Sequence, residues 1–168
     1  MPKIIENLET RLMEEAQRQI ESVGYTATTI RSVAQACGVG VGTVYNYYPS
    51  KDMLVASYML NDWRNCIGAI QAAGQTAQSP ELVARCIYEQ IRAFSDRHSA
   101  VIRDDAASAG FSSVYNRYHA LLRSHLAAPL RKFCPDDFTA EFIAESLVIW
   151  SKTEHDFEEI YSMIRKLF

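Results

Sequence analysis

Residues 40–51 combine glycines with polar and aromatic side chains, and the chemistry that they could do is non-covalent. Thr43, Asn46 and Tyr47 would lie on one side of a predicted helix over about 41–47, because residues three and four apart share a helix face. Hydroxyl and amide groups exchange hydrogen bonds with phosphate oxygens and with base edges. The residue types in this segment therefore indicate contact with nucleic acid.

A second helical pattern and a glycine turn precede that helix. Thr29 is a good N-cap residue, because its hydroxyl can accept from an amide of the following turn. Apolar residues then recur at helical spacing at Ile30, Val33, Ala34 and Cys37. Gly38 stands where this helix must end, since the residue after a helix often takes a positive φ. Val44 and Tyr48 would bury the inner side of the second helix. This pattern is typical of a helix-turn-helix, which lays its second helix in the major groove.

Charge supports the same interpretation. Residues 22–51 contain no Asp or Glu, whereas Arg31 and Lys51 within them are basic. The whole chain is mildly acidic, with a formal net charge of −3 from 17 Lys and Arg against 20 Asp and Glu. An acid-free segment can meet phosphate locally, but non-specific coating of nucleic acid would need a broad basic surface.

The segment resembles the DNA-binding signature of the TetR/AcrR family of bacterial repressors, and the resemblance covers the first third of the chain. The matching residues are Gly24-Tyr25, Thr28-Thr29-Ile30, Val33-Ala34, Ala36-Cys37-Gly38-Val39, Gly42-Thr43-Val44-Tyr45 and Tyr48-Pro49-Ser50-Lys51-Asp52 with Leu54. The sequence departs from the family at Gly40 and Val41, where a polar pair such as Ser and Lys is usual. Val41 could instead contact a thymine methyl group.

The resemblance implies an all-α chain with a DNA-binding domain at residues 1–50 and a helical effector-binding and dimerisation domain at residues 51–168. The partner would be a palindromic double-stranded DNA operator. The residues expected to bind it are Thr29, Arg31, Gly40, Val41, Gly42, Thr43, Tyr45, Asn46, Tyr47 and Lys51. Among them, Tyr45, Tyr47 and Lys51 should bind phosphates, while 41–43 and Asn46 should face the bases.

The rest of the chain shows helical spacing and no strand-like alternation. An amphipathic helix is predicted at the N-terminus, with Ile4, Leu8, Leu12, Ala16 and Ile20 on one face and Gly24 at its end. Further helices are predicted over about 51–73, 80–96 and 112–133, with a short one to about 106 and two more at 138–150 and 154–168. Residues 74–79 are predicted to be a linker, and Pro129 should kink or split its helix. Thr153 with Asp156 resembles a capping-box start for the last helix.

The central helices carry aromatic residues that could enclose a ligand. The expected effector-binding residues are Tyr58, Trp63, Cys66, Tyr88, Phe94, Phe111, Tyr115 and Tyr118. Apolar, aromatic cavities with few polar groups are typical of small-molecule sites, so a small, largely apolar effector is expected. Aromatic residues at this spacing also form ordinary protein cores, and that alternative stays open.

The last two predicted helices stay apolar to the final residue of the sequence. The residues expected at a homodimer interface are Phe138, Phe142, Trp150, Phe157, Ile160, Tyr161, Ile164 and Phe168. Two-fold dimers are the commonest oligomers, and the family resemblance favours one here. The alternative is that these helices dock on the core of their own chain.

Other classes of protein lack support in the sequence. It has no Gly-rich phosphate loop, HExxH or GxSxG motif, so an enzyme is not expected. The four histidines lack metal-ligand spacing, and no metal or other cofactor is expected. The four cysteines form no CxxC pair, which favours free thiols in a reducing cytoplasm over a redox sensor. No apolar run is long enough, at about 18 residues, to predict a membrane span.

These observations predict a cytoplasmic transcriptional repressor that a small effector releases from its operator. The effector would favour a conformation in which the two recognition helices no longer match successive major grooves, about 34–36 Å apart. The alternative is a TetR-like binding module that acts through a protein partner, as a co-activator or nucleoid factor, without a small effector.

Overall fold

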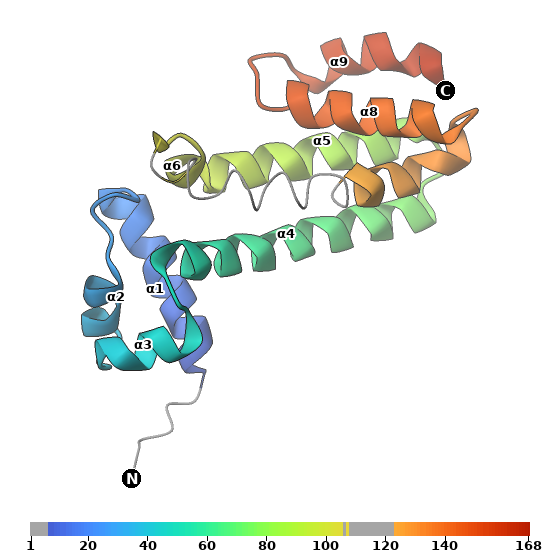
Figure 1. Ribbon diagram of the computed structural model, residues 1–168. Helices are drawn as coiled ribbons and strands as arrows, with labels where there is room; N and C mark the ends of the chain where they lie inside the picture. The colour runs from blue at the N-terminus through green and yellow to red at the C-terminus, as the bar shows by residue number, and fades with distance from the viewer. Residues whose placement is uncertain (1–6, 106, 108–122) are drawn as a thin grey trace. The chain divides into compact units, whose positions relative to one another are not determined.

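The computed structural model describes residues 7–105, 107 and 123–168, and within these ranges the chain is helical with no strand (Figure 1). The predicted all-α fold is confirmed. The helices are α1 (Leu8–Val23), α2 (Ile30–Ala36), α3 (Val41–Tyr47), α4 (Lys51–Thr76), α5 (Pro80–Arg97), α6 (Ser99–Ile102), α8 (Asp137–Trp150) and α9 (Phe157–Ile164), with two 3₁₀ segments, η1 (Ala128–Phe133) and η2 (Arg165–Leu167).

The chain packs as two compact units. The first contains the described residues of 1–61 and 98–112, and the second contains those of 62–97 and 113–168. Helix α4 therefore supplies its first eleven residues, 51–61, to the first unit and the remainder to the second. The predicted boundary between a DNA-binding domain (1–50) and an effector-binding and dimerisation domain (51–168) is a division by function, not by packing, and it stays a prediction.

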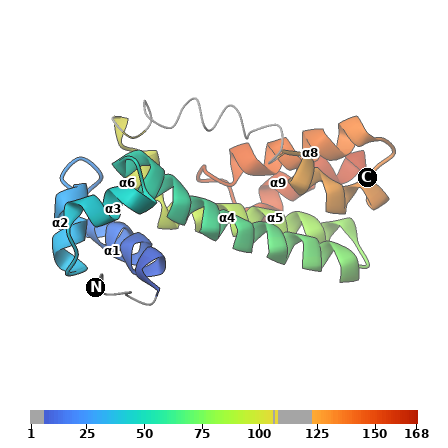
Figure 2. The same ribbon diagram turned by 60° about the horizontal axis from the view of Figure 1, so that its bottom comes forward.

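In the first unit, the amphipathic helix α1 packs against the helix-turn-helix formed by α2 and α3 (Figure 2). Its buried stripe is Leu8, Leu12, Ala16 and Ile20, at the spacing predicted from the sequence. Gly24, with φ of 86°, ends the helix and donates its N–H to the carbonyl of Ile20 at 2.9 Å. Leu12 is fully buried in a cluster with Val33, Val44 and Leu54, so one core joins α1, α2, α3 and the start of α4.

The second unit is organised around α5, which packs against η1, α8 and α9. Its core residues include Ile70, Ile87, Leu130, Ile143 and Leu147, all fully buried. Pro80 and Glu81 open α5, where proline loses no hydrogen bond and an acidic residue suits the helix dipole.

Charged and aromatic contacts of Arg85 connect α9 to α5. The Arg85 guanidinium lies 4.1 Å from the centre of the Phe157 ring. It also pairs with Glu81 at 3.0 Å and with Glu158 at 2.6 Å. The cation–π contact and the two ion pairs of Arg85 together set which side of α9 faces the core.

Two predicted helix ends were wrong. Helix α4 does not end at residue 73 but continues to Thr76, through Gly74. A Cβ at Gly74 would lie 2.3 Å from the Cβ of Pro129, so glycine is required there by close packing rather than by a linker. Helix α6 ends at Ile102, short of residue 106.

The start of the last helix also differs from the prediction. Asp156, not Thr153, is the N-cap of α9, and its carboxylate accepts from the backbone N–H of Glu159 at 2.9 Å. The Glu159 carboxylate accepts in return from the N–H of Asp156 at 3.1 Å, which completes the capping box. Near Pro129, the α-helical turns at residues 123–127 tighten to the 3₁₀ segment η1.

Among the helices of the described part of the chain, none combines the length and apolar character that crossing a membrane requires.

Candidate nucleic-acid interface

The first helix of the helix-turn-helix is fixed by local hydrogen bonds. The Thr29 hydroxyl accepts from the backbone N–H of Ser32 at 3.0 Å, and the Ser32 hydroxyl accepts from the backbone N–H of Thr29 at 3.1 Å. The N-cap predicted at Thr29 is confirmed, and the reciprocal serine makes it a full capping box. Gly38 takes a φ of 69° at the other end, as predicted, and directs the chain into α3.

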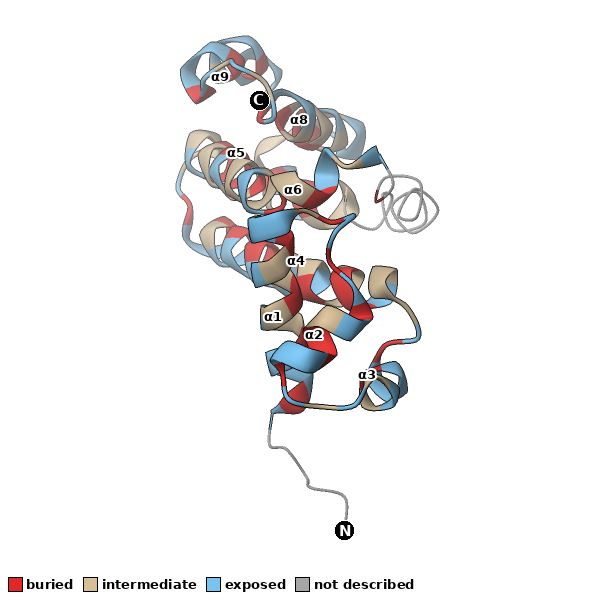
Figure 3. Cartoon of the chain, turned by 90° about the vertical axis from the view of Figure 1, so that its left-hand side faces the viewer, coloured by how far each residue is buried: buried red, intermediate tan, exposed pale blue. Residues whose placement is uncertain are grey.

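Helix α3 turns one side into the core and leaves the other to solvent (Figure 3). Val44 and Tyr48 are buried, as predicted, and burial raises the pKa of Tyr48 to about 12, so that its phenol stays protonated. Gly42, Tyr45, Asn46 and Tyr47 are exposed, while Val41 and Thr43 are half-buried. The side chains predicted to meet phosphates and bases thus include the outermost ones of α3.

The remaining predicted DNA-binding residues flank α3. Arg31 on α2 and Gly40, the N-cap residue of α3, are both exposed. Thr29 is also exposed, but its hydroxyl is engaged in the capping box. From α2 through α3 no acidic side chain is present, so the exposed face of these two helices carries only Arg31 as a formal charge.

Lys51 is held by a residue that sequence reasoning did not assign to the site. Its ammonium donates to the backbone carbonyl of Tyr25 at 2.9 Å and lies 3.8 Å from the centre of the Tyr25 ring. The Tyr25 phenol in turn donates to the Asp52 carboxylate. Burial, together with that carboxylate, raises the pKa of Tyr25 well above its ordinary value. The turn after α1 therefore positions the start of α4. In the sequence, the only feature that could have indicated a role for this turn was the Gly24-Tyr25 pair.

The predicted dimer residues divide into two groups. Phe138, Phe142 and Trp150 on α8 are exposed, with exposed fractions of 77%, 51% and 46%. Phe157, Ile160 and Ile164 on α9 are instead buried in the core of the second unit, so within the described chain their apolar side chains pack on their own unit, and their place in a dimer interface stays a prediction. The amphipathic pattern of α9 is satisfied within its own chain. Tyr161 and Phe168 are partly buried against the same core.

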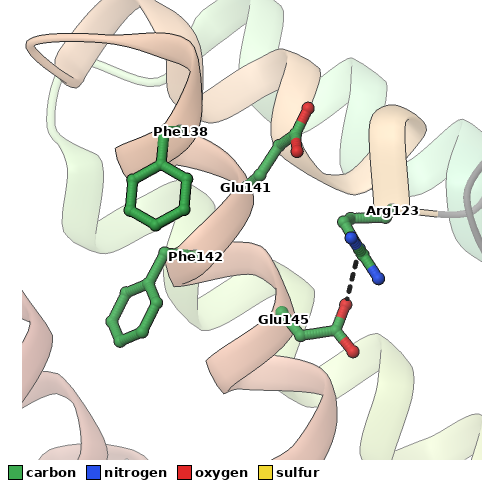
Figure 4. Close-up of a pocket in the computed structure, with 5 residues that line it drawn as sticks. All are labelled: Arg123, Phe138, Glu141, Phe142 and Glu145. Atoms are coloured by element: carbon green, nitrogen blue, oxygen red, sulfur yellow. Dashed lines mark hydrogen bonds and ion pairs between the residues drawn. The ribbon is translucent and has the colours of Figure 1, made fainter.

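A shallow groove of about 220 Å³ lies beside the exposed part of α8. It is lined by Arg123, Phe138, Glu141, Phe142 and Glu145 (Figure 4). The two phenylalanine rings project from the same side of α8, with 6.4 Å between their centres. The Arg123 guanidinium pairs with Glu145 at 3.0 Å, so a neutralised ion pair lies next to the aromatic residues.

The described members of the predicted effector-binding set belong to both units of the chain. Trp63 and Phe94 form an edge-to-face pair at 5.3 Å in the second unit, where Cys66 and Tyr88 are buried. Tyr58 belongs to the first unit and stacks on His98 with 5.6 Å between ring centres. Phe111, Tyr115 and Tyr118 lie outside the described residues. The effector site stays a prediction.

The four cysteines are free thiols. Cys37 and Cys66 are buried, and Cys86 and Cys134 are partly so. Burial raises the pKa of all four thiols, which disfavours the reactive thiolate at neutral pH.

The helix-turn-helix is similar in sequence to a known family of proteins. The family model of bacterial regulatory proteins of the tetR family matches residues 12–58, which span α1 to the start of α4. The helix-turn-helix region of this chain is therefore similar in sequence to the DNA-binding region of tetR-family regulatory proteins. A curated relative, the HTH-type transcriptional repressor KstR2 of Mycolicibacterium smegmatis, is 29% identical over 94 residues. That match covers 54% of this chain and 45% of the relative, so the chain spans about half the length of the relative that it matches.

Solved structures extend the likeness in fold across the chain. A transcriptional regulator from Streptomyces coelicolor A3(2), SCO7518, has a TM-score of 0.71 at 13% identity, over 94% of this chain and 96% of that one. A TetR/AcrR-type regulator from Aquifex aeolicus VF5 has a TM-score of 0.65 at 17% identity, over 94% and 95%. At these identities the TetR/AcrR likeness beyond residue 58 is one of fold alone.

Proposed function

We propose that this chain is a DNA-binding transcriptional regulator, a repressor that acts as a homodimer and that a small molecule releases from its operator. The observation that carries the proposal is the exposed, acid-free outer side of α3, held on a rigid core by Val44 and Tyr48. A helix presented in this way can enter a major groove, where the exposed Tyr45 and Tyr47 side chains would be able to reach phosphates.

The dimer is supported by the pattern of α8. Phe138, Phe142 and Ile149 recur at intervals of four and seven residues, which places all three on one side of the helix. Their exposed fractions of 77%, 51% and 52% leave a stripe of large apolar side chains in contact with water. Contiguous apolar surface of this kind marks an interaction site in most proteins. A second copy of the same stripe, related by a two-fold axis, is a self-complementary partner for it.

Release by an effector requires a difference in affinity between two conformations. Helix α4 is the candidate link, because its first residues belong to the first unit and its later residues, from 62, belong to the second. A ligand that favours one placement of α4 would change the spacing of the two recognition helices of a dimer. A mismatch with successive major grooves would then lower the affinity for the operator.

The proposed effector site lies around Trp63. Its indole N–H is buried and has no hydrogen-bond partner among the described residues. An unsatisfied buried donor is costly, and an acceptor atom on a bound molecule would satisfy it. The edge-to-face contact with Phe94 provides an aromatic wall beside that donor. These features favour a largely apolar effector that carries a carbonyl, hydroxyl or ether oxygen.

Replacing Trp63 with Phe should raise the effector concentration needed for half-release by about 2- to 10-fold, because one hydrogen bond is lost while the aromatic wall remains. The affinity for DNA without effector should not change, since the first unit is untouched. The measurement is titration of a protein–DNA complex with small aromatic and alicyclic carbonyl compounds. An unchanged dose response in Trp63→Phe would remove the indole N–H from the effector site.

Replacing Lys51 with Ala should weaken binding evenly across DNA sequences and lower the slope of log affinity against log salt by about 1. Only one donor of the Lys51 ammonium is committed to the carbonyl of Tyr25, and the others can face a phosphate. Lys166→Ala, which removes a cation from the second unit, should leave the slope as it is. The same slope in Lys51→Ala and the native chain would limit Lys51 to holding the turn at Tyr25.

The function itself is tested by footprinting the chain on the promoter regions adjacent to its own gene, with and without the carbonyl compounds. The proposal predicts a protected segment that the active compound uncovers. Protection that no small molecule relieves, together with a protein partner that does relieve it, would favour a module acting through that partner.

A further inference from the structure

Gly42 has no role inside the described protein. It lies within the seven-residue helix α3, is exposed, and does not have a positive φ, unlike Gly24 and Gly38. A Cβ at this position would meet no heavy atom of the described chain within 4 Å. Alanine in the same place would favour the helix, because glycine is the worse helix former of the two. The described part of the chain therefore gives no packing or conformational reason for glycine at this position.

Asn46 lies directly beyond Gly42 on the same line of the helix. At about 100° per residue, Asn46 is offset by about 40° from Gly42 and by about 200° from the buried Val44. Gly42 and Asn46 thus form the outermost line of α3. The Asn46 amide makes no hydrogen bond within the described residues, so both its donor and its acceptor are available.

We infer that the Gly42–Asn46 line is the edge of α3 that enters the DNA, with Gly42 allowing close approach and Asn46 reading an adenine. This inference rests on the proposed function. A carboxamide matches the N6 donor and N7 acceptor that adenine presents in the major groove, and it makes two hydrogen bonds to them. Without a side chain at Gly42, the backbone of α3 comes near enough to the base edges for the short Asn46 side chain to reach them.

The flanking residues fit the same placement. Tyr45 and Tyr47 stand about 100° to either side of Asn46 and have exposed fractions of 51% and 47%. Long side chains on both flanks of the entering edge can reach the two phosphate backbones that border the groove. Asn46 is therefore the residue of α3 to which sequence discrimination is assigned.

The close-approach part is tested with Gly42→Ala and a matched control, Gly68→Ala. Gly68 is also exposed and helical, and a Cβ there would also meet nothing within 4 Å, but it lies on α4 in the second unit. Both variants should have a melting temperature raised by about 1–4 °C, because alanine favours a helix. Only Gly42→Ala should lose affinity, by about tenfold or more, for the DNA that the native chain selects from a random-sequence library.

The base-reading part is tested with Asn46→Ala in the same selection. This variant should lose its preference for one A·T pair in each half-site, with discrimination there reduced by about 5- to 150-fold and other positions unchanged. Replacing that adenine by 7-deazaadenine, which lacks the N7 acceptor, should weaken the native chain and leave Asn46→Ala unaffected.

The outcomes separate this inference from the proposed function. If the native chain selects no DNA sequence, the proposed function fails and the inference fails with it. If the native chain selects a sequence and Gly42→Ala binds it equally well, or Asn46→Ala selects the same bases, the inference alone is overturned. A lower melting temperature for Gly42→Ala would also overturn it, since glycine would then serve the fold.

Discussion

A chain carrying Phe138→Glu and Phe142→Glu should sediment as a monomer, and its affinity for a two-half-site operator should fall by about 10²- to 10⁴-fold. The two rings are exposed members of the α8 stripe, at 77% and 51%, and their side chains contribute little to the core of their own unit. Carboxylates placed opposite their symmetry mates would repel and would have to lose their hydration. Without a dimer, the second half-site is no longer bound at high effective concentration.

The matched control is Leu82→Glu on α5. Leu82 is an exposed apolar residue of the same unit, with an exposed fraction of 55%, but it is not part of the α8 stripe. Analytical ultracentrifugation of the native chain and both variants gives the comparison. Dimers that persist in the Phe138→Glu, Phe142→Glu chain, or are lost equally in Leu82→Glu, would place the dimer interface elsewhere.

Replacing Leu12 with Ala should lower the free energy of unfolding of the first unit by about 2–5 kcal/mol. Leu12 is fully buried where α1 meets the helix-turn-helix, in the cluster that contains Val33 and Val44. A cavity there removes packing from the side of α3 opposite its exposed face. Affinity for DNA should fall as well, because binding would have to restore the position of α3.

Val23→Ala provides the control on the same helix. Val23 is the last residue of α1 and has an exposed fraction of 59%, so its replacement should change stability by less than about 0.5 kcal/mol. Urea denaturation followed by circular dichroism measures both changes. Similar stabilities for the Leu12→Ala and Val23→Ala chains would show that α1 does not brace the helix-turn-helix.

Features of the fold that depend on neighbouring residues were predictable from the sequence. The cap at Thr29, the positive φ at Gly38 and the buried pair Val44 and Tyr48 each follow from residue type and a spacing of a few positions. The stripe of α1 follows in the same way from its helical period. These rules act within one or two turns of helix, where the sequence alone contains the needed information.

Features that depend on distant residues were not predictable. The contact of Lys51 with Tyr25 joins residues 26 positions apart, and the approach of Pro129 to Gly74 joins two separate helices. Whether Phe157 faces its own core or a second copy of the chain depends on the position of α5. The spacing of apolar residues along α9 would be the same in both cases, so the sequence alone does not distinguish them. The site was therefore predictable at α3 and only partly so elsewhere.

The most direct test of the account is selection of double-stranded DNA by the native chain from a random-sequence library, followed by footprinting of the selected duplex. The account predicts a pseudo-palindromic site whose half-sites are about 10 base pairs, or a multiple of that, apart from centre to centre. It also predicts that protection falls on major-groove edges facing α3. No enrichment of any sequence over the starting library at low salt would contradict it.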